Sequence, residues 1–256
     1  MSYMVKLLDE LKDNGVIGIK QSFEDEGVLD KDLVTISQLC KLTELELSVK
    51  IGGCEAISDI YRCVDLDVDS IVAPMIESTF GLQKFTESIT NNLNQYSKSN
   101  TKYFINVESR QAFENINSIL ESPSSKTLNG IVVGRSDLTK SFGYGKQEVM
   151  SEHICQVVTT ILEKAKKLGL KTYMGGNIGK SSVEFIKELF KRDLLDCIET
   201  RNVILKLNSD NINNLFETIK SMLNFESEWL EYKHKHYSKF SKSYLNRSKE
   251  IKNRLV

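Results

Sequence analysis

The feature that most constrains the fold of this chain is a regular alternation of short apolar runs with longer amphipathic segments. Short runs rich in β-branched residues predict buried strands, and apolar residues at steps of three and four predict helices packed on one face. Seven strands are predicted, at Val16–Lys20, Leu45–Ile51, Ser70–Met75, Lys102–Val107, Gly130–Val133, Lys171–Met174 and Leu194–Ile198. Helices are predicted at Tyr3–Leu11, Asp32–Leu42, Glu55–Val64, Leu82–Ser97, Ser109–Leu120, Val149–Leu168 and Ser181–Arg192.

A repeated strand–helix order requires a parallel sheet buried on both faces, which leaves a closed barrel or a doubly wound sheet. Seven repeats favour an α/β fold of the TIM-type (β/α) barrel, in one domain over residues 1–210. The glycine-rich turn of a dinucleotide-binding sheet is absent after the first strand, where Lys20-Gln21-Ser22-Phe23 stands. An eighth strand is not evident: either Val203–Leu207 supplies it or the barrel is incomplete.

The C-terminal part of the chain, residues 211–256, has a different pattern. A helix is predicted from Asn211 to Leu223, followed by a tail without proline or glycine whose apolar residues recur mostly at steps of three, four or seven. This spacing predicts one long amphipathic helix that extends past the barrel. Because such a helix has nothing of its own chain to bury against, we expect it to pack on a neighbouring subunit of a homo-oligomer.

The same tail is basic, with only Glu250 to balance Lys233, Lys235, Lys239, Lys242, Arg247, Lys249, Lys252 and Arg254. A solvated lysine-rich face is the preferred interpretation, and a contact with RNA or another anionic surface is the alternative. His234 and His236 are two residues apart, so they face different sides of a helix and do not form a metal site easily. We expect them, and His153, to be surface or packing residues.

Composition excludes several classes of protein. Lys and Arg (34) nearly cancel Asp and Glu (35), so no overall field marks a nucleic-acid or membrane binder. Charged residues interrupt the N-terminal segment and no run of 18 apolar residues occurs, which predicts a cytoplasmic protein. The five cysteines contain no CxxC pair and are interpreted as free thiols.

Polar residues stand at the ends of the predicted strands, where a parallel barrel places its active site. Glu108 ends one apolar strand and Asp137 follows the next, so both carboxylates are expected at one barrel mouth. Two anions held close repel unless a cation or a shared proton lies between them. Oxygen ligands without a strand-end histidine favour Mg²⁺ or Mn²⁺ over zinc. The alternative is that these acids form salt bridges with Arg110, Arg135 or Lys50.

Glycine-rich turns follow the fifth and sixth predicted strands, at Gly134 and at Gly175-Gly176. Unpaired backbone N–H groups at such turns can hold a carboxylate or a phosphate, which predicts a small anionic substrate. Glycine can also serve only to permit a tight turn. The substrate-binding residues predicted at the mouth are Lys20, Gln21, Glu77, Gly134, Arg135, Ser136, Gly175, Gly176 and Asn177.

Three segments resemble the HpcH/HpaI aldolase and citrate lyase β-subunit family of the phosphoenolpyruvate/pyruvate barrel superfamily: residues 71–78 (IVAPMIES), 105–112 (INVESRQA) and 133–139 (VGRSDLT). The last two look like the paired metal-ligand motifs of that family. The resemblance implies a metal-dependent lyase in which Glu108 and Asp137 bind the metal and a 2-oxo or 2-hydroxy acid, or a CoA thioester of one, reacts through an enolate. It also implies an exchanged last helix between subunits.

Two departures from the family pattern affect the expected chemistry. Lys50 stands where the family usually has an arginine that supports the oxyanion, and lysine lacks the bidentate fork of arginine. The histidine that the aldolase branch carries near residues 23–27 is missing, so the base would be Glu24, Glu26 or a metal-bound water. Lys50, Glu24 and Glu26 are therefore the predicted catalytic residues.

Two alternatives to a carbon–carbon lyase stay open. One is an enzyme of the phosphoenolpyruvate or phosphonopyruvate type, in which Arg135 and the Gly175-Gly176 loop would hold phosphate. The other is an inactive barrel that serves as an assembly subunit through its C-terminal helix. The motifs GxSxG, the P-loop and HExxH are all absent from the sequence, which removes the usual support for a serine hydrolase, a nucleotide hydrolase or a zinc protease.

Overall fold

Eight strands close into a barrel in the computed structural model, which describes residues 2–24, 27–93 and 100–254. The strands are β1 (Val16–Ser22), β2 (Glu46–Lys50), β3 (Ser70–Ala73), β4 (Lys102–Val107), β5 (Gly130–Gly134), β6 (Lys171–Gly175), β7 (Cys197–Glu199) and β8 (Val203–Lys206). Each strand pairs with its neighbours in chain order and β8 pairs with β1, so no sheet edge is left open. The predicted TIM-type barrel is confirmed.

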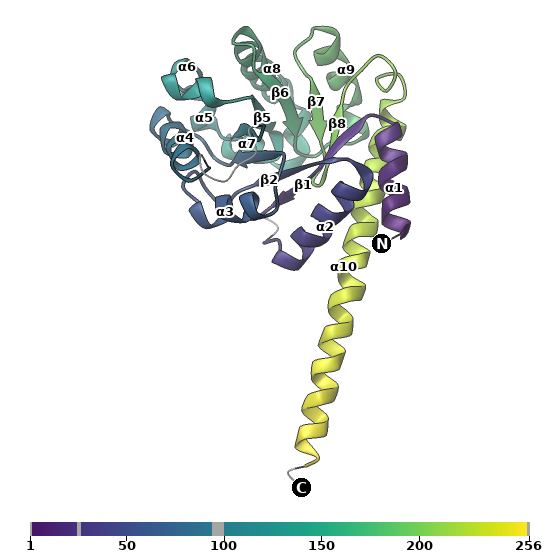
Figure 1. The fold of residues 1–256 in the computed structure, drawn as a ribbon. Helices are drawn as coiled ribbons and strands as arrows, with labels where there is room; N and C mark the ends of the chain where they lie inside the picture. Colours follow the sequence, from purple (N-terminus) through teal and green to yellow (C-terminus); the bar gives the residue numbers. More distant parts are fainter. Residues whose placement is uncertain (1, 25–26, 94–99, 255–256) are drawn as a thin grey trace.

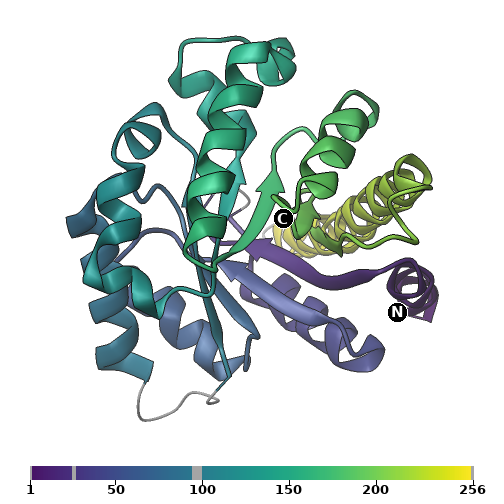
Figure 2. The same cartoon turned by 90° about the horizontal axis from the view of Figure 1, so that it is seen from above.

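Helices surround the strands and cover their outer face, as Figures 1 and 2 show. The α-helices are α1 (Ser2–Asp13), α2 (Asp30–Thr43), α3 (Ile57–Asp65), α4 (Thr79–Leu93), α5 (Arg110–Glu114), α6 (Ile116–Glu121), α7 (Arg135–Ser141), α8 (Glu152–Lys167), α9 (Val183–Lys191) and α10 (Leu215–Lys252). Short 3₁₀ turns lie at η1 (Pro123–Thr127), η2 (Lys146–Met150) and η3 (Lys180–Ser182). The predicted end of one helix at Ser97 lies outside the described residues.

Four details differ from the sequence-based prediction. The helix expected over Ser109–Leu120 is broken into α5 and α6 at Asn115, and the short helix α7 was not predicted. The helix expected to end at Leu223 does not end there, because α10 continues without a break for 38 residues. The eighth strand does lie at Val203–Lys206, but it runs antiparallel to both of its neighbours, β7 and β1, whereas the strand–helix repeat implied parallel pairing throughout.

Alternation along each strand separates the two faces of the barrel wall. Val49, Val107 and Val133 belong to the main apolar core, which fills the layer between strands and helices. The residues next to them in sequence point inward instead. Below the C-terminal strand ends, these inward residues include Val72, Phe104, Val132 and Tyr173. The ring centroids of Phe104 and Tyr173 are 4.9 Å apart. These side chains pack the interior, and the polar residues that line the cavity described below lie at the C-terminal strand ends.

The direction of α10 follows from the reversed strand β8. Asn211, just before α10, donates from Nδ2 to the backbone oxygen of Lys206, at the bottom of the barrel. Glu226, eleven residues into the helix region, accepts from the backbone N–H of Asn202, next to the top of β7. The helix therefore runs alongside the barrel from the N-terminal ends of the parallel strands toward their C-terminal ends, in the same direction as β1. Its buried residues there include Phe225 and Trp229.

Past the barrel, α10 has few partners on its own chain. Tyr237 donates a hydrogen bond of 2.8 Å to Asp32 in the first turn of α2, and Lys31 lies 4.9 Å above the ring of Phe240. Beyond Phe240 the helix projects freely, and Tyr244 and Ile251 are exposed (Figure 1). None of the helices in the described part of the chain is long and apolar enough to cross a membrane.

Candidate functional site

The C-terminal ends of the strands surround a cavity of about 960 Å³. It lies where an active site is expected in a (β/α) barrel. Its lining is mostly polar and comes from every part of the barrel mouth, including α10. The lining residues are Lys20, Ser22, Glu24, Lys50, Met75, Asn106, Glu108, Ser109, Gly134, Ser136, Asp137, Thr139, Lys140, Ser141, Lys146, Val149, Gly175, Gly176, Asn177, Ile178, Glu199, Thr200, Arg201, Leu223 and Glu226.

Glu108 is the most buried carboxylate of the cavity on the β4 side, with 3% of its surface exposed. One oxygen accepts a 3.1 Å hydrogen bond from the backbone N–H of Met75, and the other accepts 2.8 Å from Asn106 Nδ2. Met75 has φ 51°, a left-handed conformation that is uncommon for a residue with a side chain. The backbone after β3 thus turns sharply at the residue that donates to Glu108, and these contacts fix the carboxylate in one orientation.

Burial raises the pKa of the Glu108 carboxyl above its usual value, and the positive charge of Lys50 and the two hydrogen bonds oppose that rise. A buried carboxylate in this position is stabilised by any further positive charge in the cavity.

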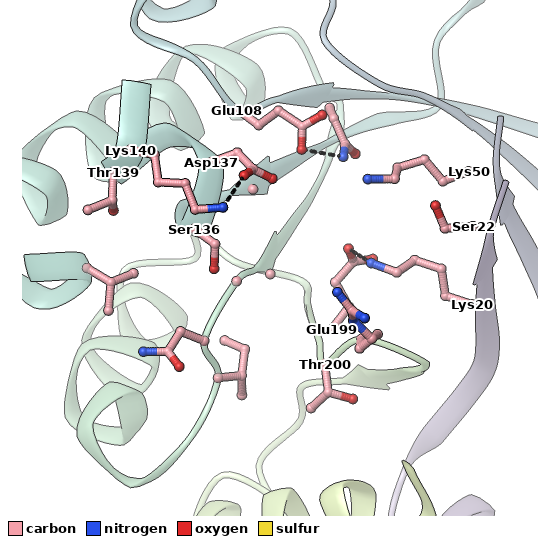
Figure 3. A pocket seen from close by; sticks show the side chains of 18 of the residues that line it. Lys20, Ser22, Lys50, Glu108, Ser136, Asp137, Thr139, Lys140, Glu199 and Thr200 are labelled. Carbon is pink, nitrogen blue, oxygen red and sulfur yellow. Dashed lines mark hydrogen bonds and ion pairs between the residues drawn. The ribbon is translucent and has the colours of Figure 1, made fainter. Parts of the chain in front are cut away.

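Asp137 lies in the first turn of α7, directly after β5. Its side chain is half exposed and forms a 3.0 Å ion pair with Lys140, one turn later. Gly134 allows Glu108 to approach this strand, since a Cβ atom at residue 134 would lie 2.7 Å from Glu108 Oε2. We call Asn106, Glu108, Gly134 and Asp137 the β4–β5 wall of the cavity. Figure 3 labels Glu108 and Asp137 of this wall.

The opposite side carries lysines that are paired with glutamates. Lys50 Nζ lies 2.5 Å from Glu24 Oε2, and Lys20 Nζ forms an ion pair with Glu199 Oε1. Ser22 lies between the two lysines in Figure 3. We call Lys20, Ser22, Glu24 and Lys50 the β1–β2 wall.

Several predicted substrate-binding residues do line the cavity, namely Lys20, Gly134, Ser136, Gly175, Gly176 and Asn177. The predicted metal ligands Glu108 and Asp137 and the predicted catalytic residues Lys50 and Glu24 line it too. Glu26 lies outside the described residues.

Three predicted residues do not line the cavity. Gln21 is fully buried on the outward face of β1, because it stands between the inward residues Lys20 and Ser22. Glu77 accepts a 2.5 Å hydrogen bond from Ser109 Oγ beside α5. Arg135 is also fully buried, and it donates to the backbone oxygens of Gly175 at 3.2 Å and Gly176 at 2.7 Å.

Arg135 therefore holds the loop after β6 from behind instead of facing the cavity. Burial lowers the pKa of its guanidinium to about 10, so the group stays charged at neutral pH.

The sequence reading missed four residues that bear on the chemistry. Ser22 and Asn106 each stand two positions from a predicted site residue on an inward face, so strict alternation along β1 and β4 would have pointed to them. Leu223 and Glu226 reach the cavity from α10. No sequence pattern marks these two, because their position depends on the reversal of β8.

Comparison with protein families gives one match: the model of the HpcH/HpaI aldolase/citrate lyase family matches residues 32–176. Among solved structures, an HpcH/HpaI aldolase/citrate lyase family protein from Burkholderia cenocepacia J2315 has a TM-score of 0.63 at 14% identity, covering 87% of this chain and 90% of that one. The HpcH/HpaI aldolase from Desulfitobacterium hafniense DCB-2 has a TM-score of 0.61 at 11% identity, covering 77% and 81%.

A structure of a citrate synthase, SbnG, has a TM-score of 0.61 at 14% identity, covering 88% of this chain and 89% of that one. Likeness at these identities shows the fold alone. No curated protein sequence matches the chain.

Proposed function

Because the chain belongs to the HpcH/HpaI aldolase/citrate lyase family, we propose that it is a metal-dependent carbon–carbon lyase or aldolase. Family membership supports a lyase-type enzyme of the phosphoenolpyruvate/pyruvate superfamily, and the family is generally dependent on a divalent metal. The proposed substrate is a small 2-oxo or 2-hydroxy acid, free or as a CoA thioester. The observation that carries the proposal is that Glu108 and Asp137 line one cavity, with Lys50 opposite them (Figure 3).

The residues of the β4–β5 wall fit a divalent cation of the Mg²⁺ or Mn²⁺ type. Glu108 is buried with a raised pKa, and Asn106 Oδ1 is a buried oxygen without a hydrogen-bond partner among the described residues. Within the same residues no three His, Cys, Asp or Glu side chains cluster as a closed metal site would need. Two carboxylates with the other positions open to water and substrate is the arrangement that Mg²⁺ favours. The ion would act as a Lewis acid that stabilises the negative charge of an enolate.

The chain's own side chains supply the rest of the proposed chemistry. Lys50 places a positive charge close enough to Glu108 to affect its pKa, and so it favours negative charge in the space between the two walls. Glu24 is the proposed base: its carboxylate lines the cavity, is partly exposed and contacts Lys50, so it can accept a proton from a substrate hydroxyl. Gly175 and Gly176 bring backbone close to the substrate, and Arg135 holds their loop in place.

The phosphoenolpyruvate-type alternative relies on Arg135 as a phosphate ligand. Its guanidinium is fully buried, donates to two backbone oxygens and to Met150 Sδ, and does not line the cavity. The placement of Arg135 therefore favours the lyase.

Two measurements test the proposed function. Mg²⁺ and Mn²⁺ are titrated calorimetrically into metal-free protein with and without pyruvate or oxalate, and exchange of the pyruvate methyl protons is followed in D₂O. We expect the metal to bind, the enolate mimic oxalate to tighten it, and the wild type to catalyse exchange.

The variants Glu108→Ala and Asp137→Ala should lose both properties. Glu114→Ala is the matched control, since Glu114 is an exposed surface residue paired with Arg110. A wild type that binds neither metal nor pyruvate would show that the proposal is wrong and would favour an inactive barrel used for assembly.

We also propose that the free part of α10 packs on a second copy of the chain. The part of α10 that extends beyond the barrel exposes four large apolar side chains, those of Phe240, Tyr244, Leu245 and Ile251. Light scattering after size-exclusion chromatography tests this: Tyr244→Glu/Ile251→Glu should lower the mass from that of an oligomer to that of a monomer, while Lys242→Glu/Lys249→Glu should not. A wild-type monomer contradicts the proposal.

A further inference from the structure

The free part of α10 carries a straight row of exposed basic and amide side chains. Its members follow one another at steps of four, three, four, three and four residues, so they lie along one side of the helix. The helix is continuous up to Lys252, and all members of the row are exposed. We call this set the lysine row: Lys235, Lys239, Lys242, Asn246, Lys249 and Asn253.

The lysine row lies opposite the apolar side of the same helix. Tyr244 and Ile251 follow Lys242 and Lys249 by two residues each, and two residues correspond to about 200° of rotation in an α-helix. Packing of the apolar side on a second copy of the chain would therefore leave the lysine row facing solvent. The row is available to a different partner.

Little of the positive charge of the row is compensated within the chain. Glu250 is the only acidic residue between positions 232 and 254. Among the described residues, Lys235 is the one lysine of the row that forms an ion pair, 3.1 Å from the exposed Glu231, and exposed pairs are weak. Four ammonium groups thus lie along about 21 Å of helix, where they attract a partner with regularly spaced negative charges.

The pattern of side chains distinguishes among anionic partners. A helix that lies on a membrane buries a continuous apolar side, but Arg247 and Ser248 occupy the turn between Tyr244 and Ile251. An interface with an acidic protein has an apolar core that is poor in lysine, and the row has no apolar member. Lys and Asn side chains do contact the phosphates of nucleic acids, without regard to base sequence.

We infer that the lysine row binds the sugar–phosphate backbone of duplex DNA. The row has no aromatic side chain on which the bases of a single strand could stack. The major groove of B-form DNA, about 12 Å wide, admits an α-helix, whereas that of an RNA duplex is deep and narrow. This binding activity goes beyond the proposed lyase, and it uses a part of α10 that projects away from the barrel (Figure 1).

Fluorescence polarisation of a labelled DNA duplex of about 20 base pairs, which is longer than the row, tests the inference with the full-length protein. Binding is measured from about 50 to 200 mM salt. We expect dissociation constants of about 10⁻⁶ to 10⁻⁴ M, and a slope of log affinity against log salt concentration steeper than about −3, as four phosphate contacts require.

Two double variants assign the binding to the row. Lys242→Gln/Lys249→Gln should make the salt slope shallower by about two and weaken binding by about tenfold or more. Arg247→Gln/Arg254→Gln is the matched control, because it removes the same charge from the same helix at positions off the row. It should change the affinity by less than about threefold. Glutamine has nearly the helix propensity of lysine and arginine, so the helix is kept in both variants.

The other outcomes would overturn the inference. They are the absence of binding at low salt, and an equal loss in the two double variants, which would mean that only the total charge of the helix matters. Tighter binding of the single strand, or of an RNA duplex of the same sequence, would also contradict it. Binding of phosphatidylserine vesicles without binding of DNA would assign the row to a membrane surface. None of these results alters the metal and pyruvate measurements that test the lyase.

Discussion

The two walls of the cavity solve the problem of buried charge in opposite ways. On the β4–β5 wall the carboxylate of Glu108 is held by hydrogen bonds from Met75 and Asn106. On the β1–β2 wall Lys20 and Lys50 each contact a glutamate. Glu108 of the first wall is thus held by neutral donors, while Asp137 beside it pairs with Lys140, and both lysines of the second wall contact carboxylates. The comparison shows that the burial of a charged side chain does not by itself indicate a binding site. What matters is whether the chain already supplies an opposite charge to that side chain.

The largest expected effect is at the β4–β5 wall. Glu108→Gln keeps the size of the side chain but removes the negative charge that would hold the metal, so pyruvate proton exchange should fall by about 10³-fold, equivalent to several kcal/mol. Deuterium incorporation followed by NMR measures this. A loss below tenfold would mean that the two walls do not differ in the way described.

The next largest effect concerns folding stability at the β1–β2 wall. Lys20→Met leaves Glu199, which is 4% exposed, without its ion-pair partner, and should lower the free energy of unfolding by about 3 kcal/mol. The double variant Lys20→Met/Glu199→Leu should recover most of that loss, as measured by urea denaturation.

Lys50→Met provides the comparison within the same wall. Its partner Glu24 is partly exposed to solvent, so the loss should be about 1 kcal/mol or less. Equal losses in Lys20→Met and Lys50→Met would contradict the different burial of the two pairs.

An effect smaller than that of Lys20→Met is expected where the two strands of the β4–β5 wall approach. Gly134→Ala adds a Cβ 2.7 Å from Glu108 Oε2 and should displace the carboxylate, weakening Mn²⁺ binding by about tenfold, or roughly 1.4 kcal/mol. Gly53→Ala is the control, because a Cβ there meets no atom within 4 Å. Calorimetric titration of both variants decides whether the close approach matters.

The smallest effect is in the pH dependence of the metal-free protein. Because burial raises the pKa of Glu108, the folded chain binds its proton up to a higher pH than the unfolded chain does. Stability contributed by that proton is therefore present below the unfolded pKa and is lost as pH rises through the folded pKa.

Glu108→Gln lacks this loss, so its melting temperature should exceed that of wild type at pH 8 and approach it at pH 4. Glu114→Gln, on the exposed surface, should show no such pH-dependent gap. A wild type that gains stability relative to Glu108→Gln as the pH rises would reverse the sign and contradict the account.

Sequence patterns predicted the barrel because buried strands and amphipathic helices each leave a local signal, at periods of two and 3.6 residues. They placed Glu108 and Asp137 after neighbouring strands for the same reason. The antiparallel direction of β8 was not predictable, since a buried strand of four residues reads alike in both directions. The ion pair of Lys20 with Glu199 joins residues 179 positions apart, so no local sequence pattern predicts it. Arg135 was predicted as a substrate ligand together with Gly134 and Ser136, which do line the cavity, but its own side chain donates to the backbone oxygens of Gly175 and Gly176 instead.

The antiparallel direction of β8 also determines where the C-terminal residues of the chain lie. Because β8 is antiparallel to the other strands, α10 starts at the end of the barrel opposite the cavity and runs back toward the cavity. It lines the cavity with Leu223 and Glu226 before it extends beyond the barrel. From Ser241 to Lys252 it extends about 18 Å beyond its last contact with α2. Whatever is joined to the C-terminus, a fused domain or a solid support, is therefore held in front of the entrance and not behind it. An attachment there would stand beside the path into the cavity, so the two ends of this chain are not equivalent places to hold it.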